Sequence, residues 1–213
     1  MDNDKKFNKR FLIFTIGQAF LLLGDFTAGS SFKVLPSWLS LFSIFIVVGY
    51  ILFYIAFITF YKVNRNYLRS FVAFIVFLLV TIFADACSQS KSDFYLAWSR
   101  GLSTSAKFLL CVMYVYFFFG TRDYFHDLGH TKGKKACVIG AIVLTVLFIA
   151  ERALTFVASL SAIKVHYIPF SICRFGSWGL IFAIDIYLFV VFLVAYIRLK
   201  KKPKEELKDE ETA

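Results

Sequence analysis

The chain has 213 residues, of which 59% are hydrophobic and 28 are phenylalanine, and its mean hydropathy is +0.71. Soluble domains are about 45–50% apolar and need polar residues along every surface helix, so this composition excludes an ordinary soluble protein. The formal net charge of +10 fits the lysines and arginines that membrane proteins collect in cytoplasmic loops. No basic and aromatic surface outside the apolar runs indicates a nucleic-acid partner.

Apolar runs of about 20 residues, the length of a membrane-crossing helix, recur along the chain. The runs are continuous rather than alternating, so they predict helices and not the strands of a membrane barrel. We expect an all-α, polytopic membrane protein with six spans, at residues 11–29, 38–61, 68–86, 103–120, 136–158 and 176–199. One transmembrane domain would then cover residues 11–199, between a basic segment at 1–10 and a charged tail at 200–213.

Lysine and arginine predict the orientation. Most of the 24 lie before the first span, in the second and fourth loops, or after the last span. Because cytoplasmic loops are enriched in these residues, both termini are expected in the cytoplasm. Trp38, Trp98 and Trp178 fall at or beside the opposite ends of the spans, as expected for a residue that prefers the membrane interface. A cleaved signal peptide in place of the first span is the alternative, and it would leave five spans.

Among the charged residues within the predicted spans, five are candidate site residues: Asp25, Asp85, Glu151, Arg152 and Asp185. Charge is costly in a bilayer, so such residues lie at its boundary, pair internally or line a functional site. The first four lie toward the outer face, whereas Asp185 is near mid-depth and should face the helix bundle. We expect all five to line an outward-facing ligand pocket. Boundary positions remain open, as do ion pairs such as Glu151 with Arg174 or Asp85 with Arg100.

Glu151 and Arg152 are adjacent in the sequence. Neighbouring side chains on a helix point about 100° apart. We therefore expect Glu151 to face the bundle and Arg152 to reach toward the lipid headgroups.

Other residues give weaker signals. His126 and His130 have the spacing of metal ligands on one helix face, but Gly129 between them favours a turn in a solvated loop, and no metal site is predicted. Cys87 and Cys173, at the outer ends of two spans, are candidates for a disulfide in an oxidising exterior. The sequence contains no nucleophile elbow, P-loop or H-E-x-x-H motif, and the identity of any cofactor stays unknown.

Two stretches carry a resemblance. In FADACSQSKSDFYLAWSRGLSTSAKFLLCVMYVYFFFGTRDYF, an aspartate closes one span and a short aromatic loop leads into an aromatic-rich span. In SAIKVHYIPFSICRFGSWGLIFAIDIYLFVVFLVAYIRLKKK, a short outer segment leads into a span with a basic exit. This layout resembles the N-terminal multi-pass sensory regions of bacterial diguanylate cyclases and histidine kinases. The resemblance implies a bacterial cytoplasmic membrane protein whose enzymatic output, with no catalytic domain in the short tail, would need a partner.

The expected function is that of an integral membrane sensor or regulatory subunit with a small-molecule ligand and a cytoplasmic protein partner. A small solute transporter or substrate-binding membrane subunit is the alternative, with the intramembrane acids carrying coupling protons. A lipid-modifying membrane enzyme is third, because nothing in the sequence brings Asp25 and Asp85 together as an acid–base pair. Catalysis is therefore not the favoured activity. Membrane lipid is an expected partner, and homo-oligomerisation is left open.

Overall fold

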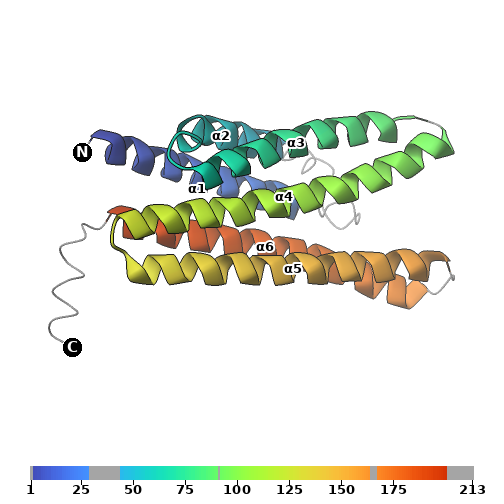
Figure 1. Cartoon of the computed structure of the whole chain (residues 1–213). Helices are drawn as coiled ribbons and strands as arrows, with labels where there is room; N and C mark the ends of the chain where they lie inside the picture. The colour runs from blue at the N-terminus through green and yellow to red at the C-terminus, as the bar shows by residue number, and fades with distance from the viewer. Residues whose placement is uncertain (1, 29–43, 91, 164–166, 201–213) are drawn as a thin grey trace. The chain divides into compact units, whose positions relative to one another are not determined.

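The computed structural model describes residues 2–28, 44–90, 92–163 and 167–200 (Figure 1). Side chains are described for these residues except 2–5, 26–28, 158–163, 167–172, 174 and 175. The helices, in chain order, are α1 Asp2–Ala28, α2 Ile44–Phe60, α3 Arg65–Ser88, α4 Asp93–Asp127, α5 Thr131–Ile163 and α6 Tyr167–Lys200. No strand occurs within these ranges, which confirms the predicted all-α class for them.

Four of the helices, α3, α4, α5 and α6, are long and apolar enough to cross a membrane. About one third or less of the residues in the most apolar stretch of each are buried, so most of these side chains lie on the surface of the chain. Apolar surface of this extent suits lipid and not water. Helix α2 is apolar but shorter, and residues 38–43 of the predicted second span lie outside the described residues.

Three helices begin well before the spans predicted for them. Helix α1 starts at Asp2 rather than near residue 11, α4 starts at Asp93, in the segment predicted as an aromatic loop, and α6 starts at Tyr167 rather than near residue 176. Asp93 in the first turn favours a helix start there, because an acidic side chain interacts well with the helix N-terminus. Hydropathy identified the lipid-suited part of each helix and missed the turns before it, where charged residues and, in α6, a proline interrupt the apolar run.

The connection between α4 and α5 is a tight reversal. Gly129 has a φ of 77°, a left-handed conformation that glycine adopts without steric cost. The Gly129 and His130 amides donate to the carbonyls of His126 and Phe125 at 3.0 and 2.9 Å. The predicted turn at Gly129 is confirmed.

The helices group into two compact units. The terminal unit comprises Met1–Thr59 and Val143–Ala213, and therefore holds α1, nearly all of α2, the second part of α5 and α6. The central unit comprises Phe60–Ile142 and holds α3, α4 and the first part of α5. Each unit has its own internal packing.

In the terminal unit, α1 and α6 run antiparallel. Near one end, Asn8 Nδ2 donates to the carbonyl of Leu199 at 3.5 Å. Further along, the buried Phe14 of α1 meets Phe192 of α6 edge-on, with ring centroids 5.1 Å apart, and stacks on Phe53 of α2 at 4.1 Å. Phe14 therefore lies where three helices of this unit meet.

Helices α1 and α2 approach each other closely at two glycines. A Cβ added to Gly17 would lie 3.1 Å from the Gly49 carbonyl oxygen, and one added to Gly49 would lie 2.9 Å from that of Gly17. Small residues allow two helix backbones to approach in this way, which is a common packing device inside membranes.

In the central unit, α3 and α4 form an antiparallel hairpin packed along its length (Figure 1). The buried Tyr67 stacks on Phe60 and meets Phe117, with centroid distances of 5.1 and 5.2 Å. A Cβ on Gly120 would lie 2.8 Å from the Tyr67 ring, so glycine lets α4 accept that ring. The Tyr67 hydroxyl is 2.9 Å from Thr121 Oγ1, which satisfies its polar tip.

Candidate functional site

Four of the five predicted site residues belong to the terminal unit: Asp25, Glu151, Arg152 and Asp185. Glu151 on α5 is only 1% exposed. Its Oε1 accepts hydrogen bonds from Thr155 Oγ1 at 3.0 Å and from Ser177 Oγ of α6 at 2.9 Å, and the two hydroxyls lie 2.9 Å apart. These contacts tie α5 to α6 through one buried carboxylate.

Arg152 completes this group by folding back onto its neighbour. Its Nε and Nη2 donate to Oε2 and Oε1 of Glu151, forming a two-pronged ion pair. Glu151 is buried as predicted, and Arg152 pairs with it while its side chain stays 27% exposed, so its reach toward the lipid headgroups stays a prediction. The 100° between adjacent Cβ directions is outweighed by the long, flexible arginine side chain. The side chain of Arg174, the alternative partner, lies outside the described residues.

The second polar group of the terminal unit joins α6 to α1. Asp185 is 7% exposed, and its Oδ1 accepts a hydrogen bond from Nε2 of the fully buried Gln18 at 3.1 Å. Asp185 is therefore buried, as its apolar neighbours predict. Gln18 was not among the predicted site residues, although an amide in an otherwise apolar run was a visible signal.

Asp25 and Tyr50 extend this second group. Asp25 of α1 and Tyr50 of α2 are half-buried and belong to the same unit as Gln18 and Asp185. Helices α1, α2 and α6 of this unit therefore each contribute a polar side chain within an apolar helix. We call Gln18, Asp25, Tyr50 and Asp185 the buried acid group, after the two residues at its centre, Gln18 and Asp185.

The two polar groups differ in chemistry. Glu151 has a guanidinium and two hydroxyls as partners, so its charge is balanced within the protein. Asp185 accepts a hydrogen bond from the Gln18 amide, and a carboxyl group buried among apolar helices is a typical proton or cation site. Ser177 and Asp185 lie on the same helix, about 12 Å apart along its axis at roughly 1.5 Å per residue.

The remaining predicted residues lie elsewhere. Asp85 belongs to the central unit and its side chain is exposed, so its place in one pocket with the other four stays a prediction. In the described part of the chain, Asp85 forms no ion pair with Arg100. Cys87 is buried in the central unit and Cys173 is half-buried in the terminal unit, each with a free thiol. Their disulfide also stays a prediction.

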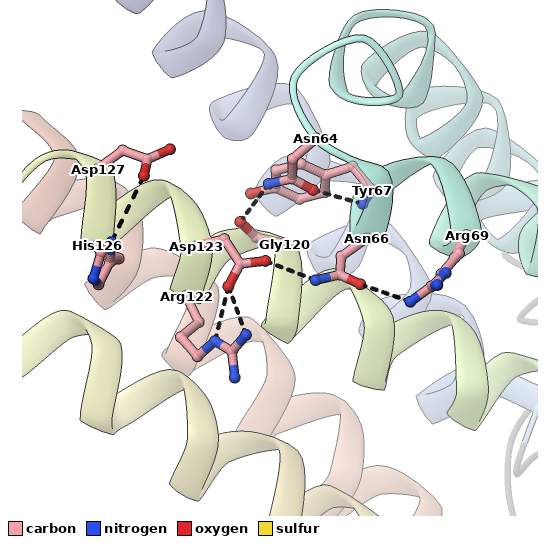
Figure 2. Close-up of polar contacts among 9 residues, drawn as sticks. All are labelled: Asn64, Asn66, Tyr67, Arg69, Gly120, Arg122, Asp123, His126 and Asp127. Atoms are coloured by element: carbon pink, nitrogen blue, oxygen red, sulfur yellow. Dashed lines mark hydrogen bonds and ion pairs between the residues drawn. The ribbon is translucent and has the colours of Figure 1, made fainter.

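A polar network that was not predicted lies at one end of the α3–α4 hairpin (Figure 2). Asn66 Nδ2 donates to Asp123 Oδ2 at 2.7 Å, while Nε and Nη2 of Arg122 donate to Asp123 Oδ1 at 2.9 and 2.6 Å. Arg69 Nη1 lies 3.4 Å from Asn66 Oδ1. We call Asn66, Arg69, Arg122 and Asp123 the hairpin-end network.

Asn64 fixes the start of α3 beside this network. Its Oδ1 accepts a hydrogen bond from the Tyr67 amide at 2.9 Å, which caps the helix. Its Nδ2 donates to the Gly120 carbonyl of α4 at 3.0 Å. The Asn64 side chain therefore both caps the start of α3 and fixes the position of that start against α4 (Figure 2).

Comparison of the chain with protein-family models, with curated proteins and with solved structures finds no match. The resemblance to bacterial sensory regions therefore stays a prediction. The function is inferred below from the buried polar side chains alone.

Proposed function

We propose that this chain is an integral membrane sensor or regulatory subunit whose buried acid group binds a small polar or cationic ligand. One observation carries the proposal: Asp185 is buried in a helix apolar enough to span a membrane, where it accepts a hydrogen bond from Gln18 of α1. A carboxyl group at membrane depth is expensive, and such groups generally mark ligand, ion or proton sites.

The proposed topology has six spans with both termini in the cytoplasm. The antiparallel contact of α1 with α6 supports it, because the N-terminal end of α1 lies beside the C-terminal end of α6. Both ends are basic: Lys9 and Arg10 lie at one, Arg198 and Lys200 at the other. Cytoplasmic ends of spans collect such residues.

The proposed signal travels along the α1–α6 contact. A ligand that adds charge or hydrogen bonds at Asp185 changes how α6 packs against Gln18 of α1. The same two helices meet again at Asn8 and Leu199, near their basic ends. A shift of one helix against the other would be read there by a cytoplasmic protein partner.

A cross-linking experiment tests this proposal. Cysteines at Asn8 and Leu199, in a chain without its four native cysteines, are oxidised in nanodiscs while pH, Na⁺ and Ca²⁺ are varied in turn. We expect at least one of these probes to change the cross-linking rate severalfold, and Asp185→Asn to abolish that change. Rates that are the same under every condition, in both chains, contradict the proposal.

A proton-coupled transporter is the second candidate. The same observation favours it, since a buried carboxyl group bonded to an amide can take up and release a proton. Net proton flux across proteoliposomes that depends on Asp185 would select transport, whereas a conformational response without flux selects the sensor.

A further inference from the structure

The hairpin-end network places one guanidinium group at each of its ends (Figure 2). Arg69 on α3 contacts Asn66, Asn66 donates to Asp123, and Asp123 accepts both donors of Arg122 on α4. The amide and the carboxylate together fix the two arginines relative to each other across the two helices. Arginine side chains on a surface seldom have such a framework, because ordering them costs rotamer entropy.

Both arginines keep donors for a further ligand. Among the described residues, Arg122 donates to Asp123 through Nε and Nη2, which leaves Nη1, and its side chain is 34% exposed. Arg69 is exposed and contacts Asn66 through Nη1 alone, which leaves Nε and Nη2. Planar guanidinium groups with spare N–H donors match the oxygens of a phosphate.

The two arginines lie where the apolar segments of their helices end. Arg69 precedes the apolar run of α3 that starts at Phe71, and Arg122 follows the run of α4 that ends at Phe119. The guanidinium of Arg69 lies 5.7 Å from the Tyr116 ring centre, and that of Arg122 lies 5.2 Å from the Phe119 ring centre. Aromatic rings with arginines beside them are typical of the level of lipid headgroups.

The charge around the network attracts anions. The same end of the central unit carries five further exposed cationic side chains: Lys62, Arg65, Lys132, Lys134 and Lys135. The acidic side chains at this end are already paired: Asp123 binds Arg122, and Asp127 lies 3.7 Å from His126. Clusters of cationic side chains beside a membrane span attract anionic lipid.

We propose that the hairpin-end network binds anionic phospholipid, with Arg69 and Arg122 each donating to a headgroup phosphate and with Asn66 and Asp123 as positioning residues. The site is separate from the buried acid group and does not depend on what that group binds.

Lipid binding to the purified full chain in detergent tests the proposal. Phosphatidylglycerol and phosphatidylcholine are titrated and bound lipid is counted by native mass spectrometry, in wild type and two double variants. Arg69→Gln with Arg122→Gln is compared with Lys134→Gln and Lys135→Gln, which removes the same charge at the same end. We expect at least a tenfold loss of phosphatidylglycerol affinity in the arginine variant and less than a threefold loss in the lysine control. The proposed site is overturned if the two variants lose phosphatidylglycerol affinity equally, or if the wild type binds phosphatidylglycerol no more tightly than phosphatidylcholine.

Two further arms complete the test. Inorganic phosphate at a concentration equal to the lipid should not displace it, and displacement would assign the site to a soluble anion instead. Arg69→Lys with Arg122→Lys keeps the charge and covers the case in which the glutamine variant does not fold. We expect it to lose at least threefold in affinity, because an ammonium lacks the fork geometry. Full affinity in the lysine form contradicts a site built on guanidinium geometry.

Discussion

The terminal and central units each contain an ion pair between adjacent residues, and the two pairs have different surroundings. Glu151 and Arg152 pair inside the terminal unit, where the carboxylate side chain is 2% exposed and bonds hydroxyls from α5 and α6. Arg122 and Asp123 pair at the hairpin end, where both side chains are about one third exposed and an amide of α3 joins them. In both pairs, Nε and Nη2 of the arginine bond the neighbouring carboxylate.

Burial decides what such a pair does. A buried carboxylate has lost its water, so removing its charge leaves the guanidinium without compensation. A half-exposed pair adds little stability, but it restrains an arginine that can then bind something else. An arginine–carboxylate pair therefore holds two helices together in the terminal unit, whereas in the central unit it orients an arginine for binding a ligand.

The largest expected effect comes from Glu151→Gln. The change leaves Arg152 without its counter-charge, although that side chain is 27% exposed and regains some water. We expect a loss of about 2–3 kcal/mol in the free energy of unfolding, just below the usual range for breaking a buried pair. Unfolding by SDS titration in mixed micelles measures it. A loss below about 0.5 kcal/mol would mean that the pair does not hold α5 to α6.

Close helix packing in the terminal unit gives the next effect. Gly49→Ala brings a Cβ to 2.8 Å from the Leu21 side chain and 2.9 Å from the Gly17 carbonyl oxygen, and that backbone atom cannot move aside. We expect a loss of about 1–3 kcal/mol from overpacking, measured in the same titration.

Gly101→Ala is the matched control for this substitution. Nothing lies within 4 Å of a Cβ at Gly101, so the control should gain up to about 1 kcal/mol from helix propensity. Equal stability of the two variants would show that α1 and α2 do not meet at Gly49.

Asp123→Asn should have a small effect on stability, because the pair it breaks is half-exposed. We expect a loss of about 0–1 kcal/mol, in contrast to Glu151→Gln. Phosphatidylglycerol binding should nevertheless weaken, since Arg122 loses its restraint. A loss of stability as large as that of Glu151→Gln would remove the distinction between the two pairs.

Asp185→Asn should change stability least. The amide is nearly the same size and can still accept the hydrogen bond from Gln18. Because removing a buried charge lowers the desolvation cost of folding, we expect stability to stay unchanged or to rise by about 1 kcal/mol. Retained folding together with a lost cross-linking response would mark Asp185 as a functional rather than a structural residue. A loss above about 2 kcal/mol would assign it a structural role.

Hydropathy predicted the helical class well, because continuous apolar runs of this length are typical of membrane-crossing helices and rare elsewhere. It missed the first turns of α1, α4 and α6, where charged residues and, in α6, Pro169 interrupt the apolar run. The turn at Gly129 was predicted correctly, because one glycine with positive φ determines it locally.

The candidate site was only partly predictable. Asp185 was identified because an acid among apolar residues is expected to face the helix bundle. Its partner Gln18 lies 167 residues away, and no local pattern shows that the first and last helices are neighbours. The bent-back Arg152 was missed because helix direction fixes Cβ and leaves the end of a long side chain undetermined. The hairpin-end network was missed because ordinary polar residues near helix ends carry no distinctive motif.

The proposed sensor requires that the buried acid group is open to the non-cytoplasmic side of the membrane. Its most direct test replaces Asp25, a half-buried member of that group, by cysteine in a chain without native cysteines. The labelling rate with a membrane-impermeant methanethiosulfonate is then measured from each side of sealed vesicles. Val190→Cys, on an exposed apolar position of α6, is the control. We expect reaction at position 25 from the outer side alone and none at position 190. Labelling of position 25 from the cytoplasmic side alone, or from neither side, would refute an outward-facing site.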